Sequence, residues 1–222
     1  MVSGDSHFYR TADGHGLAHD PFNAIVGPRP IGWISTRSIE GVANLAPYSF
    51  FNAFSYTPPL VGFSSIGWKD TVANVAATGE FVWNLATRPL AEAMNLTSAS
   101  LPTVEDEFAC SGLTPEPSRL IGAPRVGESP VNFECRLTQL IRLTDIDGQD
   151  SASWLVVGQV VAVHIERRLL VNGVYDTAAA APILRAGGPA AYAAVTPEAM
   201  FNMTRPDDRA NEEGRHADDH HR

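Results

Sequence analysis

The feature that most constrains the fold is a long alternation of side chains near the middle of the chain, VNFECRLTQLIRL, residues 131–143. Apolar residues at every second position from Val131 alternate with Asn132, Glu134 and Arg136. A period of two is typical of a strand that buries one face and exposes the other to solvent. The run therefore predicts a half-exposed antiparallel strand.

A second long strand follows it. Asp147-Gly148 is a strong turn signal, and SWLVVGQVVAVHIE, residues 153–166, is rich in β-branched residues. Two such runs joined by an Asp-Gly turn predict a β-hairpin.

Further strands are predicted at 31–37, 60–64 and 81–86, and Asn172-Gly173 predicts another tight turn. Only two short helices are predicted. One has Asp70 as its N-cap and ends before Gly79, and the other has Pro89 in its first turn. Strands and helices do not alternate regularly, which disfavours a parallel sheet. The pattern predicts a mainly β fold, either a barrel or a sandwich with helical decoration.

Composition sets the protein class. The 222 residues suffice for one domain, which we assign to residues 1–203, and the acidic, apolar-poor segment 204–222 is predicted to be a disordered tail. A net charge of -9 argues against a nucleic-acid-binding surface. No window is apolar enough for a membrane span or a signal peptide, so we expect a cytoplasmic protein with no membrane partner. Cys110 and Cys135 are expected to be free thiols.

One segment, NLAPYSFFNAFS, residues 44–55, combines aromatic rings with Ser49 and Asn52 around Pro47. It is predicted to be irregular, because it neither alternates like a buried strand nor has the polarity of a loop. Exposed peptide groups beside aromatic surface suit the rim and face of a flat heteroaromatic ligand. The alternative is a segment that closes a barrel with its phenyl rings in the core. Whatever the function, at least two of Phe50, Phe51 and Phe54 are expected in the core.

A second segment, GWKDT, residues 67–71, lies between a predicted strand and a predicted helix. A helix start offers unpaired N–H groups to an anion, and Lys69 would add a full positive charge. Ser64, Ser65 and Thr71 add hydroxyl donors. The alternative is a capped helix with a solvated lysine.

His164 is the candidate for a group beside the ligand, although a lone histidine on a strand is more often structural. No metal site is predicted, because the other histidines lack a third ligand at a fixed spacing. The chain has no GxGxxG, no GxxxxGK[ST] and no GxSxG, which disfavours a Rossmann site and an α/β-hydrolase triad.

Three stretches together resemble the flavin-reductase-like family, and within it the flavoredoxin-like branch of FMN-binding split barrels. They are HGLAHDPFNAIVGPRPIGWISTRS, NLAPYSFFNAFSYTPPLVGFSS and WKDTVANVAATGEFVWNL, and the resemblance extends from His15 to Tyr192. It implies a six-stranded antiparallel, Greek-key-like split barrel that forms a homodimer, with FMN near the subunit interface, although FAD is an alternative cofactor. It implies NADH or NADPH as reductant and an oxygenase or another electron acceptor as partner.

The resemblance also implies roles for individual residues. The flavin ring would lie along Ala46, Pro47, Tyr48, Ser49, Phe50 and Asn52. Ser35 and Thr36 would lie near the ribityl chain and phosphate, and Ser64, Ser65, Lys69 and Thr71 would hold the phosphate. His164 would position substrate, Tyr192 would cover the ligand, and Arg29 would be a further motif residue. The leading hypothesis is an NAD(P)H-dependent flavin reductase. The alternatives are an FMN-holding electron carrier that does not use nicotinamide directly and a barrel dimer that has lost flavin.

Overall fold

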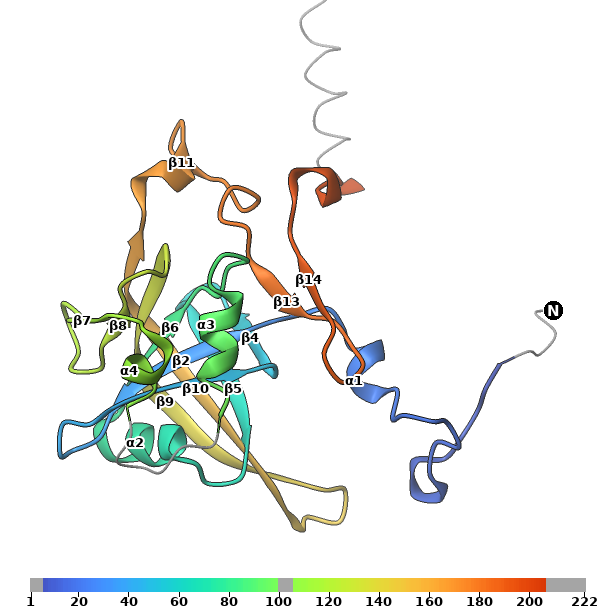
Figure 1. Cartoon of the computed structure of the whole chain (residues 1–222). Helices are drawn as coiled ribbons and strands as arrows, with labels where there is room; N and C mark the ends of the chain where they lie inside the picture. The colour runs from blue at the N-terminus through green and yellow to red at the C-terminus, as the bar shows by residue number, and fades with distance from the viewer. Residues whose placement is uncertain (1–5, 100–105, 207–222) are drawn as a thin grey trace, which may run out of the picture.

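The structure, a computed structural model, describes residues 6–99 and 106–206. Its centre is a seven-stranded antiparallel sheet with the order β3-β2-β6-β9-β10-β5-β4 (Figure 1). The strands are β2 Gly32–Arg37, β3 Ala43–Tyr48, β4 Phe51–Ser55, β5 Leu60–Ile66, β6 Glu80–Asn84, β9 Val131–Thr144 and β10 Asp150–Ile165. The mainly β, antiparallel prediction is confirmed, with one strand more than the predicted six.

The sheet curls into a partly open barrel because of how its two ends are connected. Strands β3 and β4 lie at opposite ends of the strand order, yet only Ser49 and Phe50 separate them. In a flat sheet these ends would lie roughly 30 Å apart, whereas the two-residue connection spans only about 10 Å. The Ser64 N–H also donates to the Phe50 carbonyl (2.8 Å), which joins the connection to β5.

The central hairpin is formed by β9 and β10, which pair from Val131 opposite Ile165 toward a turn at Asp147-Gly148, as predicted. Gly148 has a φ of +78°, which its lack of a Cβ permits. At Gly158 a Cβ would overlap the ring of Phe81 on the neighbouring strand β6. A side chain at this position would therefore displace the fully buried Phe81 ring.

The segment 44–55 is not irregular, and this prediction is wrong. It forms most of β3, the Ser49–Phe50 connection and β4. Pro47 lies on β3 and pairs with Trp33 of β2. Because β3 is an edge strand, a residue without an N–H is tolerated there. The expectation of at least two core phenylalanines also fails, since Phe51 is buried while Phe50 is half-buried and Phe54 is 57% exposed.

The helices are α1 Phe22–Ile25, α2 Asp70–Thr78, α3 Ala91–Leu96 and α4 Glu107–Ser111. Helix α2 ends as predicted at Gly79, which is left-handed. Asp70 is not its cap but its first residue, because Lys69 occupies the cap position in extended conformation. Helix α4 was not predicted; Asp106 caps it by accepting from the Phe108 N–H (2.8 Å).

The core has two main parts, one on each face of β2 and β3. Ile34 packs inside the barrel with Phe63 and Phe81. Trp33, the residue before Ile34, points to the opposite face and packs with Met94 of α3 and Phe108 of α4. Burial on both faces explains why β2 is a continuous buried run and not an alternating one.

The remaining elements lie at the periphery. The Asn172-Gly173 turn is confirmed between β11 and β12, and the hairpin β13–β14 pairs with β1 beside α1 (Figure 1). The small strands are β1 Arg29–Pro30, β7 Pro115–Glu116, β8 Arg125–Val126, β11 Leu170–Val171, β12 Val174–Tyr175, β13 Ile183–Arg185 and β14 Tyr192–Ala194. The predicted tail lies outside the described residues from position 207 on. Within residues 6–99 and 106–206, no helix has the length and apolar character to cross a bilayer.

Candidate functional site

A cavity of about 400 Å³ opens between the β3–β4 connection, the end of β5 and the start of α2. We call it the β3–α2 cavity. Its size lies within the range of small-molecule pockets. Its lining is Asn44, Ala46, Pro47, Tyr48, Ser49, Phe50, Ser64, Ile66, Lys69, Asp70, Thr71, Thr97, Ser98, Ala99 and Glu107.

Most of the predicted cofactor residues meet here. The lining includes Ala46, Pro47, Tyr48, Ser49, Phe50, Ser64, Lys69 and Thr71. They come from two segments about twenty positions apart, which the curled sheet brings together. The barrel closure is therefore what assembles this site.

Three predicted hydroxyl residues lie behind the cavity wall and not on it. Ser35 donates to the Pro124 carbonyl (2.5 Å) and Ser65 to the Gly67 carbonyl (3.0 Å), and both are fully buried. Thr36 Oγ1 accepts from Asn44 Nδ2 (3.2 Å), which also donates to Thr71 Oγ1 (2.9 Å). Thr36 thus helps to fix Asn44, which does line the cavity.

Two other predicted residues line different cavities. Asn52 lines a shallow one beside Phe54. Tyr192 lines a cavity between α3 and the β13–β14 hairpin.

The Tyr48 hydroxyl is the most unusual polar group of the site. It is buried, and within the described part of the chain no group completes a hydrogen bond to its Oη. Burial raises the pKa of Tyr48, and the nearby hydroxyls of Thr71 and Ser65 oppose that rise only in part. A buried O–H without a partner costs about 1–3 kcal/mol, so the Tyr48 hydroxyl would gain from a partner that enters the cavity.

The start of α2 faces the same cavity. The first intrahelical bond is donated by the Ala73 N–H to the Lys69 carbonyl (2.9 Å), so the N–H groups of residues 70–72 precede it. Lys69, the only lysine of the chain, adds its positive charge to the partial charge of the helix start. These groups suit an anion.

Acidic groups also line the cavity, and sequence reasoning missed one of them. Burial raises the pKa of Glu107, the charges of Asp106 and Asp70 add to that rise, and the Leu45 N–H opposes it by donating to Glu107 Oε2 (3.2 Å). Glu107 is brought here by α4, which follows segment 100–105, and no spacing relates it to the two motifs. Asn44 was missed as well, although it begins the segment singled out from the sequence.

Arg29 stabilises the cavity wall from behind. Its side chain is buried, donates to the carbonyls of Ser49 (2.9 Å), Asn23 and Val26, and lies 5.4 Å from the centre of the Phe50 ring. It therefore fixes the Ser49–Phe50 connection through Nε and Nη1.

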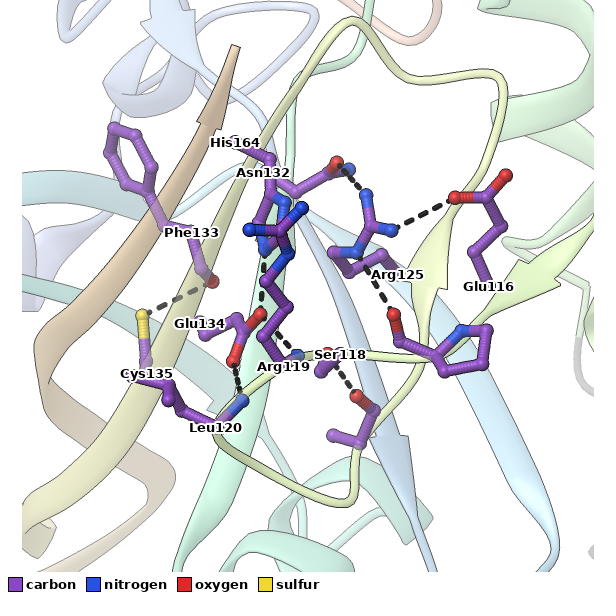
Figure 2. A network of polar contacts seen from close by, with 12 residues as sticks. Glu116, Ser118, Arg119, Leu120, Arg125, Asn132, Phe133, Glu134, Cys135 and His164 are labelled. Carbon is purple, nitrogen blue, oxygen red and sulfur yellow. Dashed lines mark hydrogen bonds and ion pairs between the residues drawn. The ribbon is translucent and has the colours of Figure 1, made fainter.

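His164 lies in a separate, polar cavity of about 440 Å³ (Figure 2). Its Nε2 lies 2.6 Å from Oε1 of Glu134, a carboxylate that is fully buried and also accepts from the N–H groups of Arg119 and Leu120 (2.7 Å each). Burial favours the protonated form of Glu134, but these donors outweigh it and lower its pKa below the ordinary value. Within one chain, His164 does not line the β3–α2 cavity.

Comparison with known proteins agrees with this geometry. Residues 27–183 match the family described as the flavin reductase like domain. The chain belongs to the flavin-reductase-like family. This confirms the resemblance read from the three sequence stretches, and it identifies the protein as a split-barrel, flavin-related oxidoreductase.

Individual relatives agree. An uncharacterised protein of Aquifex aeolicus is 38% identical over 151 residues, which cover 66% of this chain and 74% of that protein. Nitrilotriacetate monooxygenase component B from Bacillus cereus has a TM-score of 0.77 at 31% identity and covers 91% of this chain and 98% of its own. The 2-nitrobenzoate 2-nitroreductase NbaA of Pseudomonas fluorescens has a TM-score of 0.72 at 30% identity, with 83% and 88% covered.

Proposed function

We propose that this protein is an NAD(P)H-dependent flavin reductase that binds FMN in the β3–α2 cavity. The reaction is NAD(P)H + flavin + H⁺ → NAD(P)⁺ + reduced flavin. The observation that carries the proposal is that one cavity combines a helix start, a lysine and the buried Tyr48 hydroxyl, which has no hydrogen-bond partner among the described residues. An anion and a polar ring edge would satisfy these groups.

The residues present fit both ends of FMN. At the phosphate end, the α2 start, Lys69 and the hydroxyls of Ser64 and Thr71 supply donors. Asp70 and Glu107 also line the cavity and add negative charge, which Lys69 and the helix start have to outweigh.

At the ring end, β3 is an edge strand, so the peptide groups of Ala46–Tyr48 that do not pair with β2 could bond the polar edge of the ring. Ala46 and Pro47 are small and permit close approach, and the Phe50 ring supplies apolar surface. The Tyr48 O–H would donate to the ligand, which removes the cost of leaving it unpaired.

A bound flavin would supply the redox chemistry, because its ring accepts a hydride from reduced nicotinamide. The chain then has to bind and orient, and it needs no nucleophile of its own. Cys135 agrees with this, since burial raises its pKa and keeps its thiol protonated.

The partners of the protein follow by analogy. The Bacillus cereus relative is named as a monooxygenase component, and we propose that this protein likewise supplies reduced flavin to an oxygenase in the cytoplasm. We also propose a homodimer. Within one chain His164 does not line the flavin cavity, so it could position the nicotinamide only at the flavin of a partner subunit.

The test is a visible absorption spectrum of the purified protein with FMN, repeated anaerobically after NADH and then NADPH. We expect a flavin band that bleaches with one of the nucleotides. A band that persists until dithionite is added would replace the reductase with an FMN-holding electron carrier. A protein that binds no flavin would contradict both functions.

A further inference from the structure

A groove adjoins the β3–α2 cavity, and we call it the β4 groove. It measures about 360 Å³, and its lining comes mainly from residues 26–30 and from Phe51 and Phe54 of β4. Phe50 and Ser64 line both the groove and the β3–α2 cavity. A molecule in the groove therefore contacts residues that a flavin in the neighbouring cavity also contacts.

The walls of the groove are apolar and well fixed. Val26, Pro28 and Pro30 line it together with the rings of Phe51 and Phe54. The Phe51 ring stacks on Trp83, with the ring centres 5.4 Å apart and the planes 3° from parallel. The Phe54 ring lies over Gly62, where a Cβ would come within 2.7 Å of it. Such walls suit a planar, apolar ring.

Arg29 supplies a donor to this apolar space. It is buried to 9% exposure, and its Nε and Nη1 donate to the carbonyls of Ser49, Asn23 and Val26. Its Nη2 donates to no group among the described residues. In that part of the chain, Tyr48 Oη alone is a buried side-chain polar atom without a partner, so Nη2 reaches open space. The cavity that Arg29 lines is the β4 groove.

The charge of Arg29 is also uncompensated. No ion pair between described residues includes Arg29, and no acidic side chain among them lines the groove. A buried cation without a counter-charge favours a ligand oxygen that carries or gains negative charge. A full carboxylate would have to lose its hydration in apolar surroundings. A ring carbonyl is neutral when it binds and becomes negative as it accepts electrons, so it matches the groove better.

The position of this donor is set by the fold. Pro28 and Pro30 flank Arg29, and their rings fix the backbone angle φ at the residues on both sides. Arg29 also pairs with Arg185 of β13. The donor is thus in place before a ligand enters, so that binding costs little further ordering.

We propose that the β4 groove binds a quinone, which then accepts the electrons of the reduced flavin. The quinone ring packs against Phe51 and Phe54, and one carbonyl oxygen accepts a hydrogen bond from Arg29 Nη2. The redox step rests on the proposed flavin function, whereas the binding site does not depend on it.

The redox step balances as FMNH₂ + quinone → FMN + hydroquinone. The quinone gains two electrons and two protons, the two N–H bonds made when NAD(P)H reduced the flavin break, and two O–H bonds form. Arg29 stabilises the negative charge that develops on the quinone oxygen during this transfer. The protein would thereby have a second activity, as an NAD(P)H-dependent quinone reductase that needs no oxygenase.

The first test measures binding without turnover, by calorimetry on the oxidised, FMN-loaded full chain with no nucleotide present. The quinone is 2,3-dimethyl-1,4-naphthoquinone, whose methyl groups block addition of the exposed Cys110 thiol. The matched ligand is 2,3-dimethylnaphthalene, which has the same rings and no carbonyl. We expect the quinone to bind about tenfold more tightly, as one hydrogen bond to a charged group provides. It should also shift the visible absorption band of the bound FMN, since it displaces water beside the flavin.

Three variants locate the site. Arg29→Lys keeps the charge, but a single ammonium cannot serve both the carbonyls and the groove, so it should remove the tenfold preference and leave the affinity for the hydrocarbon unchanged. Phe54→Ala should weaken both ligands about fivefold, because it removes an apolar wall. The control Tyr56→Ala removes a ring that is 96% exposed and lines neither cavity, and it should change nothing. Loss of folding would lower both affinities, so the ratio of the two affinities reports the Arg29 contact.

The second test follows reoxidation of the anaerobically reduced protein by the same quinone in a stopped-flow spectrometer. We expect the rate to saturate as the quinone concentration rises. Half-saturation should need about fivefold more quinone in Phe54→Ala than in the wild type or Tyr56→Ala. A rate that rises linearly and is equal in all three proteins would mean that the flavin reacts by collision, which overturns the second activity.

Four binding results would overturn the inference. They are equal affinities of the wild type for the quinone and the hydrocarbon, Phe54→Ala affinities equal to those of Tyr56→Ala, tighter binding of 2-naphthoate than of the quinone, and an FMN band that the bound quinone leaves unchanged. Three of them do not involve Arg29→Lys or Phe54→Ala, so the inference stays testable if a variant does not fold. Wild-type protein that binds no FMN would instead contradict the proposed function, and the same ligand pair titrated into that protein would still decide whether the groove binds a quinone. The two failures are therefore distinguishable.

Discussion

The β3–α2 cavity and the His164 cavity are both lined by polar groups, but their groups are satisfied to different degrees. In the His164 cavity, the buried Glu134 carboxylate accepts from two peptide N–H groups and from His164. In the β3–α2 cavity, the buried Tyr48 hydroxyl has no partner in the described chain. The Glu134 carboxylate is satisfied without a ligand, whereas the Tyr48 hydroxyl would gain its hydrogen bond from one. This difference separates a structural network from a binding site better than the identity of the residues does.

The largest expected effect is on stability, from Glu134→Ala. The substitution leaves the N–H groups of Arg119 and Leu120 without their acceptor and opens a void in the sheet. We expect a loss of about 3 kcal/mol in the free energy of unfolding, measured by urea denaturation. The control is Glu166→Ala, which removes an exposed glutamate and should cost under about 1 kcal/mol. If both variants lost the same free energy of unfolding, the buried Glu134 network would stabilise the fold no more than an exposed glutamate does.

The same carboxylate predicts a pH dependence. Because the pKa of Glu134 is lower in the folded protein than its ordinary value of 4.5, the unfolded chain binds more protons in the acid range. Its contribution to stability is therefore complete above pH 4.5 and is lost as the pH falls below it. The plot of unfolding free energy against pH should be shallower below that pH for Glu134→Gln than for the wild type. Parallel plots would contradict the assignment.

At the flavin site the largest effect is expected from Lys69→Ala. Removal of the cation should weaken FMN about tenfold and riboflavin hardly at all, because only FMN carries the phosphate. Fluorescence titration of both ligands measures the difference, with Arg167→Ala as the control for net charge. An equal loss for both ligands would place the phosphate elsewhere. As Lys69 is the only lysine, FMN should also protect the folded protein from an amine-selective reagent at this position.

His164→Ala tests whether the complete network has a second role. If His164 positions the nicotinamide from a partner subunit, the substitution should raise the KM for NADH about fivefold and leave FMN affinity unchanged, by analogy with the loss of one neutral hydrogen bond. His164→Gln, which can still donate to Glu134, should restore stability without restoring KM. A variant that loses stability but keeps its NADH kinetics would leave His164 as a structural residue.

The comparison of the two cavities also shows what the sequence can reveal. The alternation at 131–143 and the Asp147-Gly148 turn predicted the central hairpin, because each is a local signal. Segment 44–55 was wrongly predicted to be irregular, because its aromatic residues come from two strands that face different parts of a curled sheet and do not alternate with polar ones. Lys69 and Thr71 were found because a helix start has a local pattern. Glu107 was missed because only tertiary packing brings α4 to the cavity. The pair of Glu134 and His164 was missed because the register of the β9–β10 hairpin, which contains bulges, cannot be derived from the sequence.

The smallest effect is expected from Tyr48→Phe, and its sign depends on the ligand. The ring packs on Phe63 with the ring centres 4.7 Å apart, and phenylalanine keeps that contact. In the protein without flavin, the substitution removes a buried, unpaired hydroxyl and should raise the free energy of unfolding by up to about 1 kcal/mol. With FMN bound, the hydroxyl would have gained its partner, so the variant should bind FMN a few-fold more weakly and lose the stability advantage.

Thermal unfolding with and without FMN measures both the FMN affinity and the stability of Tyr48→Phe, and Tyr9→Phe, on an outer segment, serves as the control. If Tyr48→Phe shifts the melting temperature equally in both states, the hydroxyl does not contact the ligand, and the unsatisfied group at the centre of the comparison is a packing cost and not part of the flavin site.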